Sequence, residues 1–182
     1  SHLRLGTAPK AFLGGLCVSL PALFFSRQYL GLGINSIESF LSGEKSSWGA
    51  FLLKPFFTAV TLNFGGSGGI ITPVFFTGAA AGNLFGSVFG LDVATFAALG
   101  FTAVVAGAAN TPIAASIMAI ELFGPGIASY SAIACVVSFL VTGHRSVYPS
   151  QILVFRKSKL VDVKIGDDME AVRPKVKFPD RN

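Results

Sequence analysis

The sequence predicts an all-α, polytopic membrane protein built from short, broken and tilted helices. Its 182 residues are 52% hydrophobic and 13% charged, whereas roughly 25% of residues are charged in soluble domains. The mean hydropathy is +0.66. Between Ser46 and His144 the only formal charges are Lys54, Asp92 and Glu121. Glycine and proline interrupt the apolar segments, and several segments are shorter than the ~20 residues that cross a ~30 Å hydrocarbon core.

The apolar segments supply the predicted helices. Transporter folds use short apolar helices interrupted by Gly and Pro, in which the broken backbone lines a cavity instead of facing lipid. A short surface helix is expected over residues 33–41, and residues 42–47 form the clearest polar loop. The apolar segments run over residues 10–26, 48–64, 70–89, 93–109, 112–123 and 127–141.

Small residues recur at helical spacing in the third of these segments. Gly78, Gly82, Gly86 and Gly90 fall every four residues, so on a helix they form one nearly continuous stripe. Such a stripe lets a neighbouring helix approach to backbone distance. Because glycine costs about 1 kcal/mol per residue in a helix interior, the stripe predicts a compensating helix–helix contact.

The stretch AGAANTPIAA, residues 106–115, repeats the small-residue pattern. It contains a helix-start signal in Asn110, Thr111 and Pro112. An amide or hydroxyl before the helix can cap free N–H groups, and proline fits the first turn. We therefore expect a helix to begin near Pro112.

Positive charge is concentrated in the C-terminal tail. The final 32 residues hold eight of the fourteen Lys and Arg. Basic residues beside a membrane span favour the cytoplasmic side, so Arg156, Lys157 and Lys159 predict a cytoplasmic C-terminus in a multi-pass protein of the plasma (inner) membrane. We expect residues 1–157 to form the membrane domain and 158–182 a polar tail. Nucleic-acid binding is not expected, because no basic stripe with interleaved aromatic residues occurs.

Metal and enzyme chemistry find little support in the sequence. Cys17 and Cys135 lie in apolar runs without metal-ligand spacing, and His144 has no partner at such a spacing. We therefore expect no metal site and no cofactor. A phosphate-binding P-loop would need a lysine after its glycines, but no lysine lies between Lys54 and Arg156. This disfavours a soluble nucleotide-binding enzyme, and no enzymatic activity is expected.

The stretch GGSGGIITP, residues 65–73, is the main candidate for a binding site. A helix N-terminus exposes N–H groups without intrahelical partners and carries a partial positive charge. Glycines before it clear side chains from its approach, and Pro73 suits its first turn. Such an end could hold an anion through backbone amides alone. On the glycines alone, a plain hinge between two spans explains the stretch equally well.

Three segments resemble the CLC family of chloride channels and chloride/proton exchangers. GGIITP is similar to the family's Gly-x-Phe-x-Pro signature, here from Gly69 to Pro73. AGAANTPIAASIMAIELFG resembles a small-residue helix pair that ends in a glutamate, here Glu121. VTGHRSVYPSQIL resembles the segment that carries the family's anion-coordinating tyrosine, here Tyr148. The order and spacing of the three fit the family from about residue 10 to residue 154.

The resemblance implies an anion site and a fold. The transported ligand would be chloride or a similar anion, bound by the motif at Gly69, by the amides of Ile70 and Ile71, and by the hydroxyl of Tyr148. The supporting motif residues would be Gly68, Thr72 and Pro73. The family's fold is an inverted repeat of two membrane halves, and it forms homodimers. By position, residues 112–123 and 127–141 would supply this chain's share of the dimer interface.

The sequence also departs from the family pattern. Ile71 stands where the family usually has an aromatic residue, and Thr72 where alanine is frequent. The family's Gly-Ser-Gly-Ile-Pro stretch and its Gly-Lys/Arg-Glu-Gly-Pro stretch with the gating glutamate are not in the chain. Both belong to the first repeat. We therefore expect this chain to be roughly the C-terminal half of a CLC-type membrane domain, which would need the N-terminal half as a partner.

The sequence leaves two hypotheses for the function. The leading hypothesis is anion transport, as a channel or an antiporter; the alternative is a non-transporting membrane scaffold or half-subunit.

Some single residues also have two interpretations. Without the resemblance, Tyr148 would be an ordinary interfacial aromatic. Glu121 is a functional candidate as an intramembrane carboxylate, although its place at a helix end favours a structural role. Lys54 and Asp92 are expected near the membrane edges, with the Lys54 ammonium reaching water.

Overall fold

The protein is described here by a computed structural model. It describes residues 9, 12–17, 19, 31–66, 68–143, 146–148, 151, 161–162 and 175–176. The chain divides into two compact units, Ser1–Thr102 and Ala103–Asn182, and each is considered by itself. The predicted division into a membrane domain and a tail at residue 158 stays a prediction.

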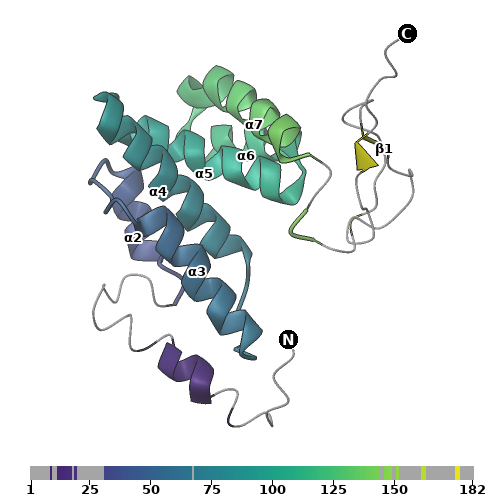
Figure 1. Ribbon diagram of the computed structural model, residues 1–182. Helices are drawn as coiled ribbons and strands as arrows, with labels where there is room; N and C mark the ends of the chain where they lie inside the picture. The colour runs from purple at the N-terminus through teal and green to yellow at the C-terminus, as the bar shows by residue number, and fades with distance from the viewer. Residues whose placement is uncertain are drawn as a thin grey trace. The chain divides into compact units, whose positions relative to one another are not determined.

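Helices of the first unit pack around α4 (Figure 1). The unit contains α2 (Ile34–Leu41), α3 (Ala50–Asn63), α4 (Ile71–Phe89) and the first part of α5 (Val93–Ala109). Both α2 and α3 pack against α4. These bounds lie within two residues of the predicted segments, because glycine and polar residues end each apolar run.

The short helix α2 is held against α4 by its apolar face and by one buried amide. Ile37 and Phe40 are buried, and the Phe40 ring packs edge-on against Phe76 of α4 with 5.4 Å between centroids. Asn83 of α4 is 0% exposed. It donates to the carbonyl oxygens of Phe40 and Glu44 and accepts from the backbone N–H of the serine at position 46. The loop after α2 is therefore fixed to the side of α4.

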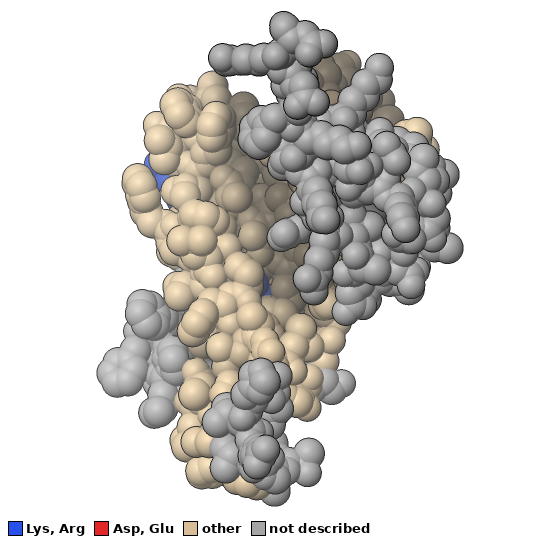
Figure 2. All heavy atoms as spheres, turned by 45° about the vertical axis from the view of Figure 1, so that its right-hand side comes forward, with Lys and Arg blue, Asp and Glu red and all other residues tan. Residues whose placement is uncertain are grey.

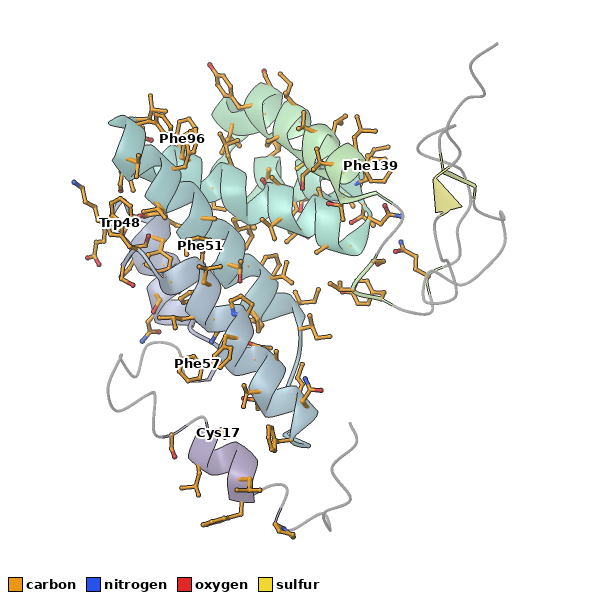
Figure 3. The ribbon with its side chains drawn as sticks, in the orientation of Figure 1. Cys17, Trp48, Phe51, Phe57, Phe96 and Phe139 are labelled. Carbon is orange, nitrogen blue, oxygen red and sulfur yellow. The ribbon has the colours of Figure 1, made fainter. Side chains whose placement is uncertain are left out.

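The predicted glycine stripe is real but shorter than expected. A Cβ on Gly78 or Gly82 would overlap backbone atoms of α5 at Gly100 or Phe96, and one on Gly86 would lie 3.1 Å from the Cα of Val93. The two helices therefore touch at backbone distance. Phe96 also stacks on Phe85 of α4, 5.4 Å between centroids (Figure 3).

Gly90 does not belong to the stripe, so the prediction of four glycines in register is wrong at this position. The helix α4 ends at Phe89, and Gly90 is its C-cap residue with φ 66°. A Cβ there would meet nothing within 4 Å. Only glycine adopts this left-handed conformation without steric cost. Gly90 thus ends the helix and takes no part in the contact.

Asp92 begins the next helix. Its Oδ2 accepts a hydrogen bond of 2.9 Å from the backbone N–H of Thr95, in the manner of an N-cap residue. Hydrogen bonds from the Thr95 side chain and backbone hold the pKa of the Asp92 carboxyl below its ordinary value. The carboxylate therefore stabilises the start of α5, and this contribution is lost as the pH falls through the lowered pKa.

The second unit is a helical hairpin. It contains the end of α5, α6 (Pro112–Phe123), the short 3-10 helix η2 (Pro125–Ile127) and α7 (Ala128–Thr142), and α6 packs against α7. Its small core groups Ala106, Ala115 and Cys135. A Cβ on Gly107 would overlap the hydroxyl groups of Ser138 and Thr142. Small residues thus let α5 and α7 approach closely.

The helix α6 begins at Pro112, as predicted, but without the predicted side-chain cap. Thr111 is its N-cap residue and makes no side-chain capping hydrogen bond. Asn110 has a φ of 61°, a left-handed conformation that asparagine tolerates better than most residues. The turn therefore depends on backbone geometry, and Pro112 supplies the first helical position.

The helices expose many apolar side chains. On the face shown in Figure 2 the described residues are almost all uncharged. By length and composition, residues 71–89 and 125–142 could cross a membrane, and the helices from Ala50, Val93 and Pro112 are apolar but shorter. A set of exposed apolar residues lines α6 and α7: Ile113, Ile117, Leu122, Tyr130, Ile133, Val137, Leu140 and Val141. This pattern fits a helical membrane protein, and the all-α class is confirmed.

The C-terminal tail contributes one short ladder. Strand β1 (Val161–Asp162) pairs antiparallel with β2 (Lys175–Val176). The basic cluster that predicted a cytoplasmic C-terminus, Arg156, Lys157 and Lys159, lies outside the described residues. The side of the membrane on which the tail lies therefore stays a prediction.

Candidate functional site

The first half of the glycine stretch ends helix α3. Gly65 has φ +89° and donates to the carbonyl of Leu62, and Gly66 donates to the carbonyl of Thr61 at 2.8 Å. These two bonds form a Schellman motif, which satisfies the last carbonyls of a helix. A Cβ on Gly66 would overlap Thr61. Gly65 and Gly66 are therefore required by the end of helix α3.

The second half of the stretch leads into helix α4. Gly68 and Gly69 are exposed, and a Cβ on Gly69 would meet nothing within 4 Å. Among the described residues, no atom outside its chain neighbours therefore crowds the Cβ position of Gly69. Ser67 between the two halves lies outside the described residues.

The start of α4 leaves backbone donors unpaired. Ile70 is the N-cap residue, without a side-chain capping bond, and Ile71 is the first helical residue. Among the described residues no acceptor takes the N–H groups of Ile70 and Ile71. The first intrahelical bond of this end runs from Val74 to the Ile70 carbonyl at 3.2 Å. Pro73 has no N–H, so its place in the first turn costs nothing.

These free amides lie at a partly open surface. The Ile70 side chain is 43% exposed, whereas Ile71 and Thr72 are half-buried and Pro73 is buried. Two amides at the positive end of a 19-residue apolar helix can hold an anion without a cationic side chain. Their role in anion binding stays a prediction.

Tyr148 lies in a segment attached to the end of α5. The backbone N–H of Val147 donates to the carbonyl of Ala108 at 2.8 Å, and the Ser146 hydroxyl donates to the same oxygen at 3.4 Å. Ala108 is in the last turn of α5, where carbonyls lack intrahelical donors. The Ser146 hydroxyl also accepts from the Tyr148 backbone N–H at 3.1 Å. The Tyr148 side chain is 45% exposed.

A comparison with known families identifies the chain. The family model described as voltage gated chloride channel matches residues 2–143. The chain belongs to this family. Membership confirms the resemblance to CLC proteins that the three motifs indicated.

Individual CLC relatives agree with this assignment. A chloride/fluoride channel protein of Pseudomonas syringae pv. tomato is 42% identical over 149 residues, which are 78% of this chain and 33% of that protein. The voltage-gated ClC-type chloride channel ClcB of Escherichia coli is 32% identical over 164 residues, covering 80% of this chain and 38% of that protein. The chain therefore spans little more than a third of the curated relatives that it matches.

A solved structure shares the fold. The crystal structure of a CLC-type fluoride/proton antiporter matches with a TM-score of 0.73 and 30% sequence identity. The match covers 79% of this chain and 37% of that chain. The all-helical CLC architecture is thus supported by sequence and by structure.

The CLC site residues divide between the two units. Gly68, Gly69, Ile70 and Ile71 belong to the first unit, and Tyr148 belongs to the second. The residues of the first group form the start of α4, and the segment of Tyr148 is hydrogen-bonded to the end of α5. Their joint coordination of one anion is a proposal, as the resemblance implied it.

The remaining predicted residues are described by their own surroundings. Glu121 is exposed near the end of α6, and its roles as functional carboxylate or structural residue stay open. Cys17 is exposed and Cys135 is buried. His144 lies outside the described residues. Within the described ranges no group of three or more His, Cys, Asp and Glu could hold a metal ion.

The prediction that the Lys54 ammonium reaches water is wrong. Lys54 is 1% exposed, and its Nζ donates to the carbonyl of Gly31 at 2.5 Å. The reason is that the glycines before α2 bring a backbone acceptor to the side of α3. Sequence reasoning also missed Asn83, although a lone amide inside an apolar helix is the kind of signal that marks a buried polar contact.

Proposed function

We propose that this chain forms the C-terminal membrane half of an anion transporter of the CLC family, with chloride or fluoride as the anion. The observation that carries the proposal is the open start of α4, where the amides of Ile70 and Ile71 have no acceptor among the described residues. The names of the relatives support both halides, as a channel or as a proton-coupled antiporter.

An anion at such a site is held by dipoles and not by a formal charge. Backbone amides at a helix N-terminus provide partial positive charge, and a site of this kind binds weakly enough to release the ion again. In this proposal the Tyr148 hydroxyl donates one further hydrogen bond. The rest of the coordination comes from the N-terminal half of the same protein, which is its main partner.

The exposed apolar residues of α6 and α7 suggest the second partner. In the lipid bilayer such a face can pack against lipid or against another copy of the chain, and the CLC resemblance favours a homodimer. We place the protein in the plasma (inner) membrane with a cytoplasmic C-terminus. The scaffold alternative uses the same face and differs from the transporter only in the absence of anion flux.

Substitution of Tyr148 in the complete protein tests the proposal. A hydrogen bond to a charged group contributes about 1.5–3 kcal/mol, so Tyr148→Ala and Tyr148→Leu should each weaken chloride or fluoride binding about tenfold or more. Isothermal titration calorimetry measures the affinity. Tyr130→Phe is the control, since it removes a tyrosine hydroxyl from the same unit and keeps the apolar ring at a position that is 63% exposed on α7. Unchanged affinity in both Tyr148 variants would contradict the role of the hydroxyl.

A further inference from the structure

Among the described residues, Lys54 is the charged side chain that the structure buries. Its Nζ donates to the carbonyl of Gly31 and lies 5.3 Å from the centroid of the Phe76 ring. Lys54 belongs to α3, Gly31 precedes α2, and Phe76 belongs to α4. One ammonium group therefore contacts both neighbours of its own helix. The proposed anion site gives this group no role so far.

The chain before α2 is shaped around the ammonium and the ring. Gly33 has φ +74°, and a Cβ there would lie 2.9 Å from Cδ2 of Phe76 and 3.3 Å from Nζ of Lys54. Any other residue would be strained at this φ and would crowd both groups. Phe76 itself is fully buried and packs against Phe40 of α2. Lys54 of α3, Phe76 of α4 and the residues at the start of α2 thus contact one another.

This contact lies close to the start of α4. Phe76 follows Ile71 by five residues, which corresponds to about 7.5 Å along a helix axis. Among the described residues no side-chain hydrogen bond caps the N-terminus of α4. Its first turns are oriented by packing against α2 and α3 and by the Phe75 ring, which stacks on Phe101 of α5 with 4.2 Å between centroids. A small displacement there would turn the amides of Ile70 and Ile71 away from a common anion position.

We propose that Lys54 is a positioning residue for the anion site, which acts through Phe76 and the Gly31 carbonyl to hold the first turns of α4. The inference rests on the proposed function. It differs from general stabilisation because Lys54 fixes the end of α4 that carries the free amides. Asn83 also fixes α4 to the α2 region, but it lies further along the helix. Substitution of Asn83 should therefore leave the N-terminal end of α4 in place.

Anion titration of the complete protein tests the inference, with Lys54→Met and Asn83→Ala as the compared variants. Methionine keeps an unbranched apolar side chain and removes the ammonium. Coupling through a packed network changes affinities by roughly 2- to 30-fold, and we expect a loss of chloride or fluoride affinity in this range in Lys54→Met. Asn83→Ala should keep the wild-type affinity at a temperature where both variants are folded. Equal affinities in Lys54→Met and wild type, or equal losses in both variants, would overturn the inference.

Two further variants keep the test decisive if Lys54→Met does not fold. Lys54→Arg retains a cation and should keep affinity closer to wild type than Lys54→Met does. Phe76→Leu leaves Lys54 in place and removes the ring beside it, and it should lower affinity in the same way; unchanged affinity in Phe76→Leu counts against the inference. Absence of anion binding by the wild-type protein contradicts the proposed function itself. Wild-type binding that Lys54→Met leaves unchanged contradicts only the positioning role.

Discussion

Asn83 satisfies three backbone groups with one side chain. Its Nδ2 donates to Phe40 at 3.1 Å and to Glu44 at 2.8 Å, and its Oδ1 accepts from Ser46 at 2.8 Å. Because Asn83 is 0% exposed, alanine would leave these groups without their partner in a poorly hydrated place. A lost partner of a buried polar group costs about 1–3 kcal/mol. We expect Asn83→Ala to lower the free energy of unfolding by about 2 kcal/mol.

Chemical denaturation of the complete protein in detergent measures this loss. The matched control is Asn63→Ala in the same unit. Asn63 is exposed, and its Nδ2 donates only to the Ala59 carbonyl one turn earlier. Surface substitutions usually change stability by less than about 0.5 kcal/mol. Similar losses in the two variants would show that the buried bonds of Asn83 do not stabilise the first unit.

Lys54 shows what sequence reasoning misses at the scale of a residue. A lysine in an apolar helix is expected to extend its ammonium to water, and nothing in the neighbouring residues argues otherwise. The acceptor that holds it belongs to Gly31, and the space comes from Gly33. Both are far from Lys54 in the sequence. Burial of this side chain is therefore a property of the packed unit and not of the local pattern.

At the scale of the helix, the contact of α4 with α5 depends on glycine. A Cβ on Gly82 would overlap the backbone of Phe96, and one on Gly100 would overlap that of Gly78. Alanine gains about 1 kcal/mol of helix propensity over glycine, but overpacking costs typically about 1–3 kcal/mol. Since backbone atoms cannot rotate away, the cost of overpacking should exceed the gain in helix propensity. We expect Gly82→Ala to lower the melting temperature of the complete protein by several degrees.

Gly126→Ala is the control for the glycine contact. Gly126 lies in η2, and a Cβ there would meet nothing within 4 Å. Its φ is not in the left-handed range, so alanine should be tolerated without loss. Thermal unfolding followed by circular dichroism compares the two variants. A melting temperature of Gly82→Ala equal to that of wild type would mean that α4 and α5 can separate at no cost.

Helix positions were predicted well because their signals are local. The bounds of α5 and α6 agree with the predicted residues 93–109 and 112–123; α4 differs from its predicted segment by one residue at its start, and α7 by one residue at each end. Most of these boundaries lie at a glycine, proline or polar residue, which affects only the next few backbone angles; the starts of α4 and α7, with Ile70 and Ile127 as N-cap residues, are the exceptions. Gly90 was assigned to the stripe because it follows Gly86 by four residues. A C-cap glycine can stand at that same distance from the last stripe residue, so spacing does not distinguish the two roles. Gly100, the partner of the stripe, could not be found from spacing, because it lies on another helix.

At the scale of the whole molecule, the sequence predicts the candidate site residues but not how they come together in the fold. The start of α4 is visible as glycines before a proline-containing apolar helix, and the structure adds that Gly65 and Gly66 end α3. The anion-site interpretation of Gly68 to Pro73 and the hinge interpretation therefore both stay predictions. Tyr148 has no local signal beyond its place near a helix end. Its connection with the amides of α4 is a proposal that rests on the motif resemblance to CLC proteins.

The division of the site between two units leads to the last prediction. In the proposed site the amides of α4 and the hydroxyl of Tyr148 would supply only part of a coordination shell, and an anion at lipid depth would need the remainder filled by other polar groups. The chain spans 33% and 38% of two curated relatives, which leaves the other groups to the rest of the protein.

Liposomes that contain only the 182-residue chain should release neither chloride nor fluoride, whereas liposomes with the complete protein should release at least one. Flux through the chain alone would contradict the need for the N-terminal half. No flux through either protein, together with dimers in size-exclusion chromatography, would favour the scaffold.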